Sequence, residues 1–262
     1  MSSRGTARLA GTSSAPVTKE IASDVQMLRT RLKQILAQQD SDGRKCGAAK
    51  WGVYAFYDFD GEPIYVGQTR EKLSGRIGRH LTNQRSDAVA MRILDPLEVA
   101  EIEVWPLWHL QSTSGKDKTA LAEIDSLEYS VWRAAIEGSK FSAILNEKRP
   151  PSDTVVPLPE SFRGQLYEGD ELDARRHADV RVARRAEAVS RLADVVRERG
   201  EVSAGLRRTL AVQTLRLAYL AAERSALADG RPIPTPDAMD AVALVGDQLA
   251  DPTIDEEWDD DE

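Results

Sequence analysis

Two short segments rich in aromatic and β-branched residues flank a turn sequence, and together they predict a β-hairpin. Trp51–Tyr57 comes before Asp58–Gly61, and Pro63–Val66 comes after it. Aspartate and glycine are typical of turns, and runs of this composition on either side of a turn are typical of paired antiparallel strands. The hairpin would place two triplets beside each other, Gly52-Val53-Tyr54 and Tyr65-Val66-Gly67.

The residues that follow the hairpin predict a small α+β (α/β) module. Apolar residues recur at helical spacing in some segments and alternate in another, as Ile102 and Val104 do. Pro106 indicates that this alternating strand ends there or lies at a sheet edge. We expect helices over 72–83, 86–94 and 116–137, a third strand over 101–108 and a closing segment over 141–146. The predicted fold is a compact three-stranded antiparallel sheet flanked by helices, in the order β-β-α-β-α.

Changes in composition divide the chain into five parts. Four prolines between residues 150 and 159 mark a boundary, and the sequence after it predicts helices over 171–199, 204–227 and 236–249. An amphipathic helix is also expected before the hairpin. The predicted parts are a disordered N-terminus (1–17), an N-terminal helix with a basic linker (18–50), the hairpin module (51–150), a helical C-terminal region (151–250) and an acidic tail (251–262).

The negative charge of the chain belongs to its second half. The whole sequence carries −8, but residues 1–150 contain 21 Lys+Arg and 19 Asp+Glu, whereas residues 151–262 contain 14 and 24. The first half is therefore compatible with a nucleic-acid partner. The single cysteine, Cys46, excludes an intramolecular disulfide, and no apolar run approaches the ~18–20 residues that span a bilayer. We expect a soluble cytoplasmic protein.

Two charged segments each leave two interpretations open. The last twelve residues, Asp251–Glu262, contain eight acids and no base. They form either a solvated, disordered tail or a DNA-mimicking or partner-binding tail anchored by Trp258. The first C-terminal helix is locally basic, so it either lies along phosphates or is solvated. Its arginines are Arg175, Arg176, Arg181, Arg184, Arg185 and Arg191.

Glu128 falls within the apolar stripe of the predicted helix over 116–137. Winding this helix at about 100° per residue groups Glu128 with five apolar positions, namely Leu121, Ile124, Val131, Trp132 and Ala135. An inward-facing carboxylate is costly unless a cation or hydrogen bonds compensate it. Glu128 is therefore either a metal ligand or a structural acid paired with a base such as Arg76.

The two triplets, the downstream arginine and Glu128 together resemble the GIY-YIG nuclease superfamily. The resemblance covers roughly residues 51–146 and implies a nuclease domain over 51–150. It implies that Tyr54 and Tyr65 lie in a site that hydrolyses phosphodiesters, where they activate the attacking water. Arg76 matches the family's phosphate-binding arginine. His80 follows one helical turn later, at a position where the family has His or Tyr, and would assist proton transfer.

The same resemblance implies that Glu128 holds a single Mg²⁺ or Mn²⁺ ion and that Asn146 supports the site by hydrogen bonding. Gln68 departs from the pattern, because several members have a lysine after the second triplet. A nearby cation is expected to supply that charge, and others are expected to contact DNA phosphates. These phosphate-binding residues are Arg70, Lys72 and Arg79.

The expected function is that of a metal-dependent DNA endonuclease, in a restriction or phage and plasmid defence role. Cutting both strands would need two sites, so a homodimer is expected, with a protein partner as an alternative use of the acidic tail. Two other functions stay open. One is a catalytically inactive, nuclease-like DNA-binding or assembly subunit of a larger complex, and the other is a structure-specific repair or mobile-element nuclease.

Overall fold

The computed structural model describes residues 23–81 and 93–250. Three predictions lie outside these residues, in whole or for the most part. They are the disordered N-terminus over 1–17, the short helix over 86–94 and the acidic tail over 251–262.

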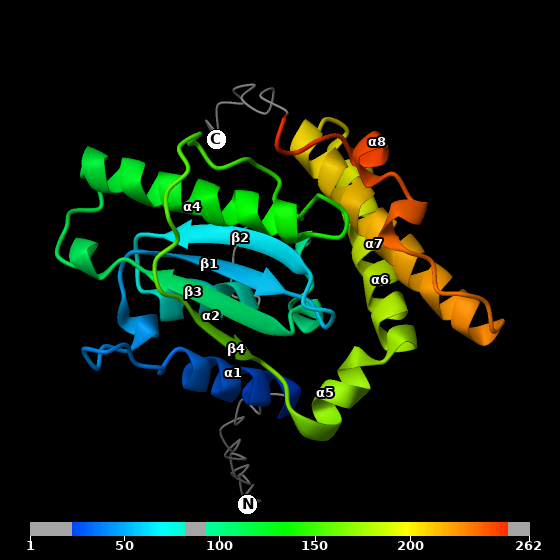
Figure 1. Cartoon of the computed structure of the whole chain (residues 1–262), viewed down its shortest axis with the longest axis horizontal. Coiled ribbons are helices and arrows are strands. Elements are labelled where there is room, and N and C mark those ends of the chain that lie inside the picture. Colours follow the sequence, from blue (N-terminus) through cyan, green and yellow to red (C-terminus); the bar gives the residue numbers. More distant parts are fainter. Residues whose placement is uncertain (1–22, 82–92, 251–262) are drawn as a thin grey trace, which may run out of the picture.

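An antiparallel sheet of four strands forms the centre of the fold, and the predicted α+β class is confirmed (Figure 1). Its strand order is β2-β1-β3-β4, with β1 at Gly52–Tyr57, β2 at Pro63–Thr69, β3 at Glu101–Pro106 and β4 at Phe162–Gln165. The predicted count of three strands was wrong, because β4 pairs with β3 from beyond the proline-rich boundary. Only four residues long and interrupted by Gly164, β4 carries too weak an alternation to stand out in the sequence.

The predicted hairpin of β1 and β2 is confirmed. Tyr54 lies opposite Gly67, and Phe56 lies opposite Tyr65, so both motif tyrosines face the same side of the sheet. Asp58 organises the turn, because its Oδ1 accepts hydrogen bonds from the backbone N–H groups of Asp60 and Glu62.

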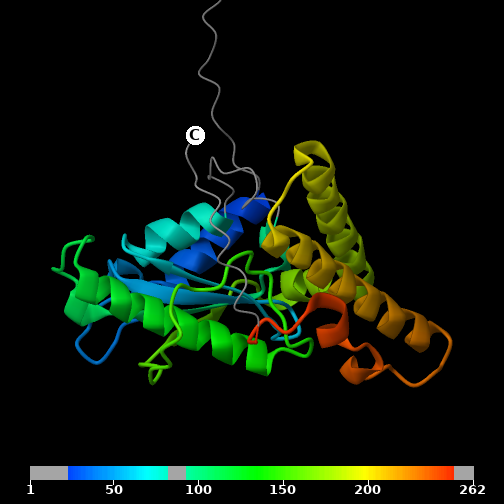
Figure 2. The same cartoon turned by 90° about the horizontal axis from the view of Figure 1, so that it is seen from above.

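Helices cover both faces of the sheet, as Figure 2 shows. On one face lie α1 (Ser23–Ile35) and α2 (Leu73–Leu81), whose apolar residues join Tyr54 and Phe56 in the larger core. On the other face lies α4 (Lys118–Gly138), capped by Asp117 and packed through Ile124, Leu127 and Trp132. Side chains along β1 point alternately to the two faces of the sheet. Neighbouring residues of this strand therefore pack into different hydrophobic cores.

The C-terminal region is helical but is divided differently from the prediction. It consists of α5 (Gly169–Arg176), α6 (Ala178–Arg199), α7 (Ala204–Ala228) and α8 (Ala241–Val245). The helix expected over 171–199 breaks at His177, which caps α6 by accepting a hydrogen bond from the N–H of Asp179. The last predicted helix is reduced to a 3₁₀ turn and the short α8.

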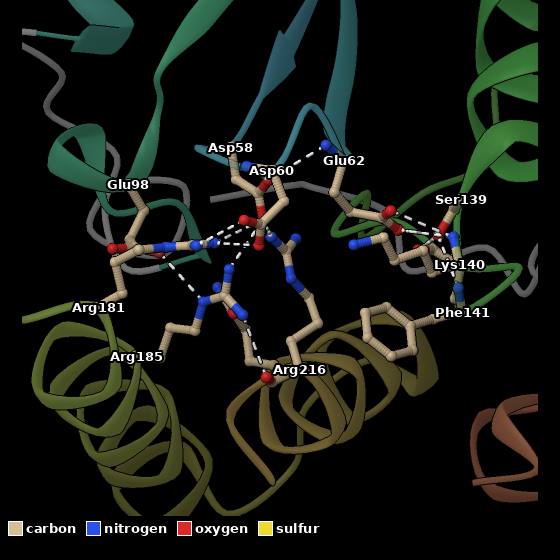
Figure 3. Close-up of polar contacts among 12 residues, drawn as sticks. Asp58, Asp60, Glu62, Glu98, Ser139, Lys140, Phe141, Arg181, Arg185 and Arg216 are labelled. Atoms are coloured by element: carbon tan, nitrogen blue, oxygen red, sulfur yellow. Dashed lines mark hydrogen bonds and ion pairs between the residues drawn. The ribbon is translucent and has the colours of Figure 1, made fainter. Parts of the chain in front are cut away.

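A buried arginine–carboxylate cluster joins the hairpin turn to α6 and α7 (Figure 3). Oδ2 of Asp58 accepts hydrogen bonds from Arg181, Arg185 and Arg216 at 3.3, 2.8 and 2.7 Å. Asp60 also bonds Arg181, and Glu98 bonds Arg185. We use the name arginine–carboxylate cluster for these six residues: Asp58, Asp60, Glu98, Arg181, Arg185 and Arg216.

Both sequence interpretations of the arginine-rich helix were therefore wrong for two of its members. Arg181 and Arg185 are 2% and 4% exposed, so they contact neither solvent nor phosphates. Arg184 lies outside the cluster and bonds the buried Asp95 instead. The sequence could not distinguish these uses, because the carboxylates that pair with the arginines lie far away along the chain.

Within residues 23–81 and 93–250, no helix has the length and apolar character that crossing a membrane requires.

Candidate active site

Tyr54 occupies the middle of β1 and is completely buried on the face that α2 covers. Its neighbour across the hairpin is Gly67, and a Cβ atom on Gly67 would lie 2.7 Å from the phenol oxygen of Tyr54. That separation is too short for any side chain, so the glycine of the second triplet provides the space that the tyrosine of the first one occupies.

The helix α2 brings Arg76 and His80 to this phenol. The two residues are four apart and therefore share one helix face. Nε2 of His80 lies 3.0 Å from the phenol oxygen of Tyr54, and Nε of Arg76 donates a hydrogen bond to the same oxygen at 3.4 Å. Because the phenol oxygen accepts from Arg76, its own O–H group can donate to His80.

Tyr65 completes an aromatic group around His80. Its ring centroid lies 5.6 Å from that of His80 and 6.3 Å from that of Tyr54, and it stacks on Phe56 at 5.9 Å. Unlike Tyr54, Tyr65 is partly exposed. The structure thus brings Tyr54, Tyr65, Arg76 and His80 together, with Tyr65 and Arg76 the members that retain access to solvent.

Glu128 approaches from the opposite face, around the free edge of β2. This edge turns the N–H groups of alternate residues outward. Asn146 accepts a hydrogen bond from the N–H of Val66, and the side-chain nitrogen of Gln68 donates to Oδ1 of Asp125 on α4 at 2.6 Å. Hydrogen bonding from the backbone and side chain of Gln68 also lowers the pKa of Glu128. Gln68, the position that departs from the family pattern, therefore lies between the edge of β2 and the acids Asp125 and Glu128 of α4.

The charge of Glu128 is poorly compensated within the protein. Burial raises the pKa of Glu128 to about 7, while the bonds from Gln68 and the charge of Arg76 oppose that shift. Within the described residues, Glu128 forms no ion pair within 4 Å. For Arg76, burial disfavours the charge, but Tyr54, Tyr65 and Glu128 outweigh it and raise the pKa of the guanidinium. The guanidinium of Arg76 and the carboxylate of Glu128 therefore stabilise each other's charged form across the sheet edge.

This arrangement fits a divalent ion held by one protein carboxylate. A partly buried carboxylate with a raised pKa is stabilised by a cation, and Mg²⁺ commonly takes only one or two carboxylates and keeps several waters. The described residues contain no group of three or more His, Cys, Asp or Glu that could enclose a metal on their own. An ion at Glu128 would therefore depend on water and substrate oxygens for its other ligands.

Asn146 lies beside the edge strand rather than among the tyrosines. Its side chain accepts from the N–H of Val66 at 3.0 Å and donates to the C=O of Val66 at 2.8 Å. The neighbouring N–H of Leu145 bonds the C=O of Ile64. The side chain of Asn146 thus acts like a short extra strand, and it fixes the backbone between Tyr65 and Gly67.

The three cations expected to bind phosphate lie outside this group. Arg70 is exposed just after β2, and Lys72 is exposed just before α2. Arg79 lies on the outer side of α2, where it forms an ion pair with Glu71. Within the described residues, none of these three cations forms an ion pair with Glu128. The lysine of the family pattern is therefore not replaced by another cation, and Gln68 acts on Glu128 through hydrogen bonding instead.

Comparison with known families agrees with this geometry. The family model described as the GIY-YIG catalytic domain matches residues 50–133. Residues 50–133 of the chain therefore form a GIY-YIG catalytic domain. The matched residues contain β1, β2, α2, β3 and most of α4, and therefore Tyr54, Tyr65, Arg76, His80 and Glu128. Searches of curated proteins and of solved structures found no match. A GIY-YIG catalytic domain supports a nuclease of this type and implies DNA as its substrate.

The GIY-YIG match ends before Asn146 and leaves α5 to α8 outside it. Sequence reasoning missed two features of the site. One is the pairing of Gln68 with Glu128, and the other is the contact of Asn146 with backbone groups rather than with a catalytic side chain. The sequence offered a clue to the role of Gln68, because this position departs from the family pattern. The sequence offered no clue to the contact of Asn146, since nothing near residue 146 indicates a hydrogen bond to residue 66.

Gly67→Ala is expected to displace the Tyr54 phenol from Arg76 and His80. The added methyl group would cost roughly 1–3 kcal/mol of stability by overpacking, and DNA cleavage should fall about 10- to 100-fold. Gly164→Ala is the matched control, because its Cβ would lie 2.8 Å from Ile35 on the same sheet face but away from the site. It should lower the melting temperature comparably and leave cleavage per folded molecule unchanged.

Glu128→Gln is expected to stabilise the metal-free protein above neutral pH. Because burial raises the folded pKa of Glu128 from 4.5 to about 7, the native state holds its proton more tightly than the unfolded state. Wild-type stability from this group is complete below about pH 4.5 and is lost as pH rises through 7. With EDTA present, the stability of the variant relative to the wild type should rise by roughly 2–3 kcal/mol between pH 5 and pH 8. Urea unfolding at the two pH values checks this, and equal stability at both would contradict it.

Proposed function

We propose that this protein is a metal-dependent DNA endonuclease that hydrolyses phosphodiester bonds at the site formed by Tyr54, Tyr65, Arg76, His80 and Glu128. The observation that supports it best is the convergence of Arg76 and His80 on the phenol of Tyr54. A guanidinium, an imidazole and a phenol in mutual contact supply phosphate binding and proton transfer in one place.

Arg76 would bind the scissile phosphate. Its Nε donates a hydrogen bond to the phenol oxygen of Tyr54. Neither terminal nitrogen bonds a described residue, so both can donate to phosphate oxygens. The raised pKa keeps the guanidinium charged. A planar donor of this kind, held by a buried phenol, stabilises negative charge that grows on the phosphate during the reaction.

The two tyrosines would have different tasks. Tyr54 is completely buried and cannot reach solvent, whereas Tyr65 is partly exposed. Tyr65 is therefore the phenol that contacts the attacking water. Tyr54 would order Arg76 and His80 through its hydroxyl, and His80 would assist proton transfer by polarising that phenol.

Glu128 would hold the Mg²⁺ or Mn²⁺ ion. When bound, such an ion supplies positive charge to the phosphodiester oxygens and neutralises the carboxylate. Asn146 would act on the site indirectly, because it fixes the backbone of β2 at Val66. Arg70, Lys72 and Arg79 would contact phosphates on either side of the cleaved bond.

One residue of the site bears on the wider biological role. The histidine at position 80 resembles the restriction-endonuclease members of the family, which favours restriction or phage and plasmid defence in the cytoplasm. Cleavage of both strands from a protomer with one site would use a homodimer. The acidic tail would then be available for a protein partner.

Incubation with plasmid, linear duplex, branched and single-stranded DNA tests the proposal. Purified protein with Mg²⁺ or Mn²⁺ should cut at least one of these substrates, and EDTA should stop it. Tyr65→Phe should slow cleavage by about 10² or more. Tyr57→Phe is the matched control, because Tyr57 lies on the same strand pair but bonds Glu103 instead of the site residues. Binding of all four substrates with no cleavage in either metal would instead favour a DNA-binding subunit.

A further inference from the structure

A basic groove of about 650 Å³ lies between α1 and α2 and includes the 3₁₀ turn at Cys46–Ala48. Figure 2 shows these two helices side by side on the same face of the sheet. None of the described residues that line the groove is acidic, although the chain as a whole carries −8. Its cations come from three separate segments and are Arg29, Lys33, Lys45, Lys72 and Arg79.

Four of these five cations have no counterion among residues 23–81 and 93–250. Arg79 forms an ion pair with Glu71, but Arg29, Lys33, Lys45 and Lys72 form none within 4 Å in the described part of the chain. This differs from the arginine–carboxylate cluster, where every arginine contacts an acid. A concentration of unpaired cations in an acidic protein attracts anions, and several in a row suit a polyanion better than a single small ion.

Two glycines give a second, independent indication that something approaches this surface closely. Gly75 and Gly78 line the groove within the nine-residue helix α2, although glycine is a poor helix former. Packing does not explain them. A Cβ on Gly78 would meet no described atom within 4 Å, and one on Gly75 would meet only the flexible end of Arg79 at 3.7 Å. The two glycines therefore leave space for a closely approaching ligand where α2 lines the groove.

The groove and the candidate active site share the helix α2, which contributes residues to both. Lys72 precedes Arg76 by four residues and Arg79 follows it by three, so all three lie along one side of α2. Arg76 turns toward Tyr54 at 3.4 Å, while Lys72 and Arg79 turn toward α1. If one phosphate of a DNA strand lies at Arg76, the neighbouring phosphates of that strand would lie over the two glycines and near Arg29 and Lys33.

We propose that the groove between α1 and α2 binds the sugar–phosphate backbone of the substrate DNA next to the cleaved bond. This rests on the proposed function, because it takes Arg76 as the position of the scissile phosphate. It assigns the N-terminal helix, which lies outside the matched GIY-YIG domain, a direct role in holding the substrate. Contacts of this kind position the strand without reading its sequence.

The salt dependence of DNA binding tests the proposal without requiring cleavage. Affinity of a fluorescent duplex is measured by anisotropy in EDTA over a range of salt. The variant is Arg29→Gln/Lys33→Gln. The control is Lys116→Gln/Lys118→Gln, which removes the same charge from exposed positions around the start of α4, the helix on the other sheet face. Each lost phosphate contact lowers the slope of log K against log salt by about 0.9.

The groove variant should bind about 10- to 100-fold more weakly at about 0.1 M salt, with a slope smaller by about 1.8, and the control should match the wild type. Gly78→Glu should weaken binding at least about tenfold without lowering the melting temperature, because glutamate is a better helix former than glycine. Equal slopes for wild type, groove variant and control, or normal binding by Gly78→Glu, would overturn the proposal. A wild type that binds DNA but never cuts it would count against the proposed function alone, since the slopes are measured without metal.

Discussion

Asp58→Asn is expected to lower the free energy of unfolding by about 3–5 kcal/mol, the largest stability effect that the fold predicts. Asp58 is 1% exposed and is the shared acceptor of Arg181, Arg185 and Arg216. Arg181 and Arg185 keep Asp60 and Glu98 as partners. Arg216 bonds no other acid in the described residues, and its Nε and Nη1 atoms already have no hydrogen-bond partner there. The substitution therefore leaves a buried, uncompensated cation.

Urea unfolding of three variants measures this effect. Asp60→Asn is the control, because Asp60 is one-third exposed at its side chain and shares only Arg181, so a loss near 1 kcal/mol is expected. Asp58→Asn/Arg216→Met removes both members of the pair and should recover part of the loss. A change below about 1 kcal/mol for Asp58→Asn would show that the cluster does not hold the C-terminal helices on the hairpin turn.

Arg76→Ala is expected to reduce single-turnover DNA cleavage by about 10³ while the protein remains folded. The guanidinium donates to Tyr54, and Tyr54 in turn contacts His80. Its loss would remove the proposed phosphate contact and one bond that positions the phenol. Arg76→Lys keeps the charge but not the planar pair of donors, so an intermediate loss of about 10- to 100-fold is expected.

Arg79→Ala provides the comparison on the same helix. Arg79 lies one turn from Arg76 but pairs with the exposed Glu71, so its loss should weaken DNA binding and leave the rate at saturating enzyme within about threefold. Rapid-quench measurements at saturating enzyme separate the two effects. Similar rate losses for Arg76→Ala and Arg79→Ala would mean that α2 contributes only general positive charge.

The parts of the fold that the sequence predicts are those that local patterns determine. The hairpin follows from strand composition on both sides of an Asp-Phe-Asp-Gly turn, and the register that pairs Tyr54 with Gly67 follows from the hairpin. Helical spacing places Arg76 and His80 on one face of α2, and it places Glu128 between apolar positions of α4. Each of these inferences uses residues within a few turns or strands of one another.

The parts that escaped prediction depend on contacts between distant segments. Neither β4 nor the bond from Asn146 to Val66 has a strong local pattern, and each needs a partner that only the folded sheet provides. The partners of Arg181 and Arg185 could not be predicted from the charge pattern of the sequence for the same reason. Interleaved arginines on a helix look identical in the sequence whether they face solvent, phosphates or a buried carboxylate such as Asp58.

Single-turnover cleavage by Glu128→Gln beside the wild type tests the central claim most directly, because Glu128 is the residue through which a metal-dependent site would act. The substrate is an end-labelled DNA that the wild type cuts in Mg²⁺, with enzyme in excess and binding verified by anisotropy. The account predicts that the variant binds the DNA as tightly as the wild type and cuts it at least about 10³-fold more slowly. Cleavage by the variant within about tenfold of the wild-type rate would contradict it.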